Sequence, residues 1–148
     1  MKVLFLDIDG VLVNKRSLAE RNQMCRSVAD PACIASLNRI VEATGCKVVL
    51  SSSWRFCGLQ EMNRILEFWG CKFQLHGMTP DLTRKQDTLY VGVPRGREIE
   101  EWLRTSQVDS FVILDDDADM EPLAPHLVRT VFEHGLTNEL ADAAIALL

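Results

Sequence analysis

Short apolar runs alternate along the chain with longer amphipathic segments. Continuous apolar runs at residues 3–6, 47–50 and 111–114 are typical of parallel strands that are buried on both faces. Two apolar stretches that polar residues interrupt, at residues 72–75 and 127–131, predict two further strands. Five strands are therefore expected, with segments of helical length between most of them.

The intervening segments carry helix signals. Asp30 and Pro31 form a helix start, with Asp30 as the cap, and Gly45 ends that helix. A second helix has an apolar stripe from Leu59 to Trp69 and stops at Gly70. Two more helices are expected, over residues 97–104 and after the capping residue Thr137.

Strands that alternate with helices predict an α/β fold, a Rossmann-like doubly wound parallel sheet with helices on both faces. A length of 148 residues fits a single domain over residues 1–148. Residues 14–30 are polar and irregular, and residues 77–96 are rich in glycine and proline, so we expect two loop-like excursions and no full cap domain.

Three of the apolar runs end in polar clusters. Asp7 and Asp9 follow the first run, residues 51–53 (three serines) follow the second, and residues 115–119 hold four aspartates. In open α/β sheets, ligands bind beyond the carboxyl ends of the strands. We therefore expect these clusters, far apart in sequence, to meet at one edge of the sheet.

Several carboxylates at one point repel each other, and a divalent cation relieves that repulsion. A ligand set of oxygen atoms without His or Cys suits Mg²⁺. In such a site Asp7 is a candidate nucleophile toward phosphorus, and Asp9 is a candidate acid and base. Gly10 leaves room for the phosphoryl group beside the turning chain.

Phosphoryl transfer also needs groups that hold the phosphate oxygens. Ser51 and Ser52 are both candidates for a hydroxyl contact. A cation is also required, and Arg97 is the first candidate, with Arg95, Lys85 and Arg84 as alternatives in the same region.

Four segments carry a family resemblance: DIDGVL, VVLSSSWR, GREIEEW and FVILDDDAD, which together span residues 3–119. In this order they resemble the motifs of the haloacid dehalogenase (HAD) superfamily, in a small capless form. The resemblance implies Asp7 as nucleophile, Asp9 as acid and base and as a metal ligand through its backbone carbonyl, and Ser51 on the phosphate. It further implies Asp116 on Mg²⁺, with Asp115 supporting the basic residue.

The resemblance leaves two assignments open. The family usually has Lys in the third motif, where this chain has Arg97. The acidic run also permits other registers, in which Asp117 or Asp119 would be the metal ligand.

Composition narrows the function classes. The net charge of −5 disfavours binding of nucleic acid by the protein surface as a whole. Five cysteines without a C-x-x-C pair argue against a disulfide framework and a zinc site. No apolar run reaches membrane-spanning length, so we expect no membrane partner and a cytoplasmic location.

We therefore expect a Mg²⁺-dependent phosphomonoester hydrolase that works through an aspartyl-phosphate. A capless site is open and favours an extended or macromolecular phosphorylated substrate. The SSSWR and basic-helix pattern also resembles small HAD domains associated with RNA repair, which implies a nucleic-acid end phosphate. The alternatives are a receiver-like phosphoacceptor module and a HAD-fold protein that binds phosphate without catalysis.

Overall fold

The computed structural model describes residues 1–19, 28–86 and 89–148. Within them, a sheet of five parallel strands has the order β3-β2-β1-β6-β7. The central strand β1 pairs with β2 on one side and β6 on the other, so that Leu6 lies opposite both Leu50 and Leu114. The strands are β1 (Lys2–Leu6), β2 (Lys47–Leu50), β3 (Gly77–Met78), β6 (Ser110–Asp115) and β7 (Leu127–Arg129).

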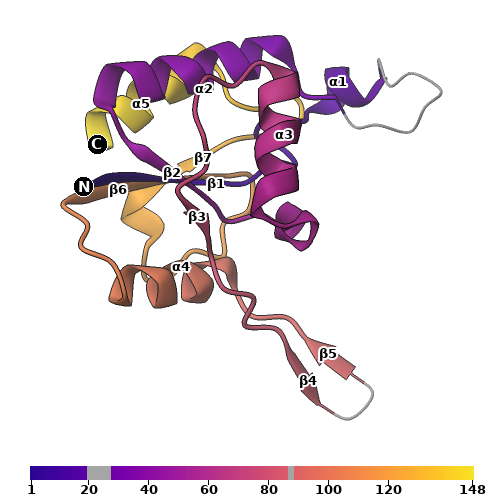
Figure 1. The fold of residues 1–148 in the computed structure, drawn as a ribbon, viewed down its shortest axis with the longest axis vertical. Helices are drawn as coiled ribbons and strands as arrows, with labels where there is room; N and C mark the ends of the chain where they lie inside the picture. The colour runs from indigo at the N-terminus through magenta and orange to yellow at the C-terminus, as the bar shows by residue number, and fades with distance from the viewer. Residues whose placement is uncertain (20–27, 87–88) are drawn as a thin grey trace.

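Helices cover both faces of this sheet. Figure 1 shows α2, α3 and α5 on one face and α4 on the other. Side chains alternate along β1 accordingly: Leu4 and Leu6 join the core of the first face, while Val3 and Phe5 pack with Ile99 of α4. This confirms the predicted doubly wound, Rossmann-like fold. The helices are α2 (Pro31–Thr44), α3 (Leu59–Trp69) and α5 (Asn138–Leu147) on the first face and α4 (Arg95–Arg104) on the second.

The predicted helix ends are confirmed where capping residues mark them. The Asp30 carboxylate accepts a hydrogen bond from the Ala32 N–H (2.9 Å), and Gly45 ends α2 in the left-handed conformation. Gly70 ends α3 in the same way, and the Thr137 hydroxyl accepts a hydrogen bond from the Leu140 N–H at the start of α5.

The strand predicted at residues 72–75 is wrong. The Lys72 and Leu75 N–H groups donate instead to the side chains of Asn38 and Asn63, at 2.9 and 2.8 Å. The strand that pairs with β2 lies just beyond, at Gly77–Met78. Asparagine side chains on α2 and α3 thus replace strand partners over these residues.

The long loop expected at residues 77–96 is also wrong in part. It contains β3 and an antiparallel hairpin of β4 (Arg84–Gln86) and β5 (Leu89–Val91), and α4 already begins at Arg95. The hairpin projects away from the sheet beyond α4 (Figure 1). Strands of three residues outside the core show no hydrophobic alternation, so the sequence pattern did not reveal them.

The first excursion is described in part. It begins with a short helix, α1 (Lys15–Ala19), and residues 20–27 lie outside the description. Two short 3₁₀ helices, η1 (Ser53–Cys57) and η2 (Ala124–His126), follow β2 and precede β7. Within the described residues, no cap domain accompanies the sheet and its helices.

Four of the five cysteines are described, and all four are free thiols, three of them buried. Cys25 lies outside the described residues. None of the helices in the described part of the chain has the length and apolar character that crossing a membrane requires.

Candidate active site

The polar clusters after β1, β2 and β6 meet at one edge of the sheet, as predicted. Backbone hydrogen bonds continue the pairing past the strand ends: the Asp7 N–H donates to the Leu114 carbonyl (3.0 Å), and the Ser51 N–H to the Leu6 carbonyl (2.9 Å). Asp115 is the last residue of β6. The rigid sheet therefore places Asp7, Ser51 and Asp115 side by side.

Three carboxyl groups converge here. One oxygen each from Asp7, Asp115 and Asp116 lies within 4.8 Å of the others. Burial, together with the charge of the neighbouring Asp7, raises the pKa of Asp115 to about 7. Burial also raises the pKa of both Asp7 and Asp116. Carboxylates so crowded and desolvated are stabilised in their ionised form by a divalent cation, and oxygen ligands of this kind fit Mg²⁺.

Gly10 makes space for the acidic cluster. Its φ is +78°, and a Cβ at this position would overlap the Asp116 carboxyl group. The Thr130 hydroxyl donates to the Gly10 carbonyl (2.7 Å) and holds this turn from β7. The missing side chain at Gly10, predicted to keep a phosphoryl group uncrowded, thus also makes room for the Asp116 carboxyl group.

The Asp9 side chain is exposed and does not belong to the group of three carboxylates. One of its oxygens accepts a hydrogen bond from the Trp54 indole N–H (2.9 Å). Trp54 also packs edge-on against Trp69, with ring centroids 5.7 Å apart. Trp54 is therefore a packing residue that also fixes the direction of Asp9, a role that the sequence pattern did not predict.

The structure distinguishes the two candidate serines. The Ser52 side chain hydrogen-bonds to Asp7 and partly offsets the effect of burial on the pKa of that carboxyl group. Ser51 is fully buried, and its hydroxyl has no hydrogen-bond partner among the described residues. Ser52 therefore contacts the candidate nucleophile, whereas the Ser51 hydroxyl has no partner among the described residues.

Arg97 was the first candidate for the cation that holds the phosphate, and the structure shows that this prediction is wrong. Its side chain is 65% exposed and pairs with Glu100 on the outside of α4 (3.0 Å). Arg95 instead lines the cavity together with the acidic cluster. Its positive charge offsets part of the rise that burial causes in the pKa of Asp7 and Asp115. Residues two apart on a helix point about 200° apart, so one of these arginines faces inward and the other outward.

The remaining two alternatives, Arg84 and Lys85, lie on β4 in the hairpin, where the structure describes no side chains. Arg95 is therefore the cation among the candidates that the described residues bring to the acidic cluster.

A buried glutamate holds two arginines at the cavity. Glu98, 2% exposed, accepts two hydrogen bonds from the Arg55 guanidinium (2.7 and 2.8 Å) and one from Arg95 (2.9 Å). The Leu82 N–H donates to the same carboxylate (3.1 Å). The pairing of Arg55 with Glu98 could not be predicted from the sequence, because the two residues come from separate motifs whose approach depends on how α4 packs against the sheet.

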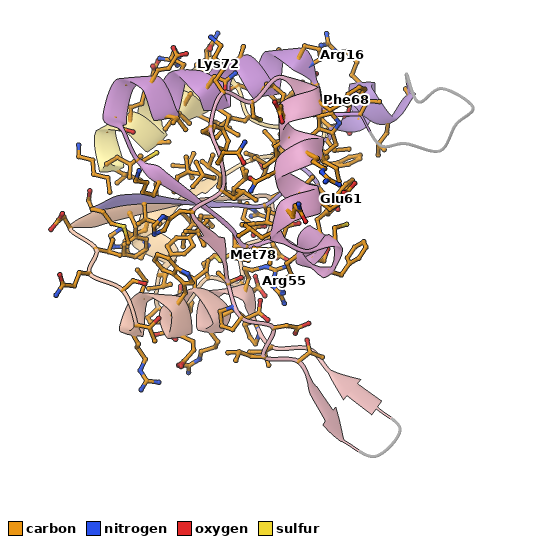
Figure 2. The ribbon with its side chains drawn as sticks, viewed as in Figure 1. Arg16, Arg55, Glu61, Phe68, Lys72 and Met78 are labelled. Carbon is orange, nitrogen blue, oxygen red and sulfur yellow. The ribbon has the colours of Figure 1, made fainter. Side chains whose placement is uncertain are left out.

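These groups surround a cavity of about 650 Å³. One wall is acidic and is formed by Asp7, Asp115, Asp116, Asp117 and Asp119. The other side includes Ser53, Arg55, Phe56, Met78, Arg95 and Glu98. Figure 2 shows Arg55 and Met78 near the level at which the chain leaves the sheet for the hairpin.

The register of the acidic run follows from its hydrogen bonds. The Asp119 carboxylate accepts from the Arg95 N–H (3.3 Å) and so caps α4. The Asp117 N–H donates to the Asp115 carboxylate (2.9 Å). Asp116 is therefore the member of the run that joins Asp7 and Asp115 in the group of three carboxylates.

Comparison with known proteins agrees with this arrangement. A family model described as the HAD domain in Swiss Army Knife RNA repair proteins matches residues 3–141. Comparisons with curated proteins and with solved structures gave no significant match. Since the matched region covers nearly the whole chain, including every cluster described above, the chain belongs to this family of HAD domains.

Proposed function

We propose that this protein is a Mg²⁺-dependent phosphomonoester hydrolase that removes the terminal phosphate of a nucleic acid, with Asp7 as the nucleophile. The observation that carries the proposal is the convergence of the Asp7, Asp115 and Asp116 carboxyl groups in a cavity that Arg95 also lines. Membership of a HAD family named for RNA repair supports both the reaction and the substrate class.

The three carboxyl groups fit a bound Mg²⁺, because burial raises each of their pKa values and a cation beside them would favour the ionised forms. Asp7 and Asp116 would hold the ion, and the family resemblance adds the Asp9 carbonyl. When bound, Mg²⁺ neutralises negative charge on the cluster and on the phosphate. The chain's own groups carry out the remaining steps.

In the first step an Asp7 carboxylate oxygen attacks phosphorus, the bond to the leaving oxygen breaks, and Asp9 donates a proton to that oxygen. In the second step Asp9 accepts a proton from water, the water oxygen attacks phosphorus, and the bond to Asp7 breaks to release phosphate. The hydrogen bond from Trp54 occupies one Asp9 oxygen, which leaves the other available for these transfers.

The phosphate needs donors opposite the nucleophile. Arg95 supplies a guanidinium that Glu98 holds in place. Ser52 uses its single O–H donor on Asp7 and so orients the nucleophile, and the unpartnered hydroxyl of Ser51 would be the further donor at the end of β2. Donors fixed by the fold stabilise the charge on the transferring phosphoryl group without reorganising.

The decisive experiment follows phosphate release from short RNA oligonucleotides with a 3′- or a 5′-terminal phosphate, with Mg²⁺ and with EDTA. We expect Mg²⁺-dependent turnover that Asp7→Asn abolishes and Asp9→Asn slows by about 10²–10⁴-fold. A single labelling event on Asp7 without turnover would contradict the proposal and favour a phosphoacceptor module. Binding of phosphate without either event would favour a non-catalytic protein.

Two arginines on the same helix test the assignment of the cation. Arg95→Ala should raise KM and lower kcat/KM by about 10²-fold or more, since a charged donor to the transferring group is lost. Arg97→Ala should change kcat/KM less than about twofold, because its side chain lies on the outside of α4. Equal losses in both variants would refute the role of Arg95.

A further inference from the structure

Phe56 exposes an aromatic ring at the mouth of the cavity. Its relative exposure is 83%, yet it is among the residues that line the cavity with Asp7 and Arg95. Phe68 on α3 is similarly exposed (76%) but does not line the cavity. Single exposed apolar side chains are common on protein surfaces, so position at the cavity distinguishes Phe56 from Phe68.

The backbone around Phe56 is held on both sides. The Ser52 hydroxyl caps the 3₁₀ helix η1 through the Trp54 N–H (3.3 Å), and the Gly58 N–H closes it on the Arg55 carbonyl (3.0 Å). The neighbours of Phe56 are also fixed, Arg55 by Glu98 and Trp54 by Asp9. The ring is thus carried on a rigid support beside the reacting groups.

We propose that Phe56 is a specificity-determining residue that stacks against the base of the terminal nucleotide while its phosphate lies at Asp7. This inference rests on the proposed function. A cavity of about 650 Å³ is larger than a phosphate group needs and leaves space for the attached nucleoside. Stacking on an aromatic side chain is a common way to bind unpaired bases without selecting their sequence.

Charge favours recognition of one nucleotide over recognition of a long strand. The net charge of −5 and the acidic wall of the cavity repel an extended phosphate backbone. The two arginines at the cavity, Arg55 and Arg95, both pair with Glu98, which neutralises part of their charge. They therefore suit the binding of one phosphate and do not form an extended basic surface. A base stacked on a neutral ring adds affinity without further positive charge.

The test compares two single-stranded RNA oligonucleotides that carry the same terminal phosphate, one with a base on the terminal nucleotide and one abasic there. Wild-type protein should prefer the base-bearing end in kcat/KM by roughly tenfold, the size of a stacking interaction. Phe56→Ala should lose most of this preference, and Phe56→Trp should retain it. Because the ring is exposed, the Phe56→Ala variant should keep the wild-type thermal midpoint.

Phe68→Ala is the matched control, since it removes an equally exposed ring on the outside of α3, away from Arg55 in Figure 2, and should keep the full preference. Turnover of both oligonucleotides with the same preference in wild type and Phe56→Ala would overturn the role of Phe56 while leaving the proposed function intact. Absence of turnover on either oligonucleotide would instead count against the proposed function. A phosphotyrosine peptide hydrolysed faster than either RNA, with that advantage lost in Phe56→Ala, would reassign the ring to a peptide.

Discussion

At the scale of single residues, Gly10 joins the first and last motifs. Its left-handed backbone excludes most other residues, and the space beside its Cα is filled by the Asp116 carboxyl group. A side chain here would therefore meet two independent penalties, one from backbone conformation and one from overlap with a candidate metal ligand.

Gly10→Ala separates these penalties when it is compared with Gly45→Ala. Gly45 also has a positive φ (+65°), but a Cβ there would meet open space. Both variants should lose about 1 kcal/mol or more in the free energy of unfolding from backbone strain. Only Gly10→Ala should also lose Mg²⁺ binding, measured as the shift in thermal midpoint on adding Mg²⁺. An unchanged Mg²⁺ shift in Gly10→Ala would mean that Asp116 is not held in place by this contact.

At the scale of elements, helix α4 brings three contacts to the site. Gly96 packs against the backbone of Met120, where a Cβ would come within 3.0 Å. The Arg95 N–H is capped by Asp119 from the acidic loop. Glu98, one turn further along, ties α4 to η1 through Arg55. The acidic motif and the arginine motif are thus positioned by one helix.

Glu98→Gln tests whether this buried carboxylate positions the arginines. Removing its charge takes the shared buried counter-ion from two partly buried guanidinium groups and leaves Arg55 only the more exposed Asp81 (3.4 Å), which should lower the free energy of unfolding by about 3 kcal/mol. Because Arg95 loses its fixed direction, KM for a phosphorylated substrate should rise. If phosphate binding instead became tighter in Glu98→Gln, the added positive charge would outweigh positioning.

Glu101→Gln on the same helix provides the control. Glu101 pairs with Arg104 at 2.8 Å, and both side chains are well exposed. Exposed pairs contribute at most about 1 kcal/mol, so this variant should match the wild type in stability and in KM.

At the scale of the whole molecule, the acidic cluster couples folding stability to pH and, under the proposed function, to Mg²⁺. In the folded protein the pKa of Asp115 is raised to about 7, above its ordinary value of 3.8. The folded state therefore holds a proton that the unfolded chain has already lost, and stability decreases as pH rises from about 4 to about 7. Each pH unit in this window costs up to about 1.4 kcal/mol for one group.

We accordingly expect the Mg²⁺-free protein to have a higher thermal midpoint at pH 5.5 than at pH 8. Mg²⁺ requires ionised carboxylates, so the increase in thermal midpoint on adding Mg²⁺ should be larger at pH 8 than at pH 5.5. Differential scanning calorimetry at the two pH values, with Mg²⁺ or with EDTA, measures both effects. If Mg²⁺ raised the thermal midpoint equally at the two pH values, the metal would not bind to this acidic cluster.

Much of this architecture could be predicted from local patterns. Buried strands are recognisable as continuous apolar runs. The cap at Asp30 and the helix end at Gly70 depend only on residues within one helical turn, so they could be predicted and are confirmed. The sheet edge that gathers Asp7 and Asp115 also follows from strand direction alone. The hairpin β4–β5 could not be predicted, because it forms a sheet of its own from strands of three residues, which are too short for a hydrophobic pattern.

The sequence by itself therefore determined the class of fold, the gathering of the acidic residues at one sheet edge and the oxygen atoms that they offer as ligands. These features depend on strand direction and residue type, which can be read from short segments of the sequence. Tertiary structure decided which arginine faces the cavity, which serine reaches Asp7, and that Glu98 binds Arg55. These choices depend on the rotation of α4 and on how it packs against the sheet. A rotation by two residues, about 200°, would exchange the inner and outer faces without altering any motif.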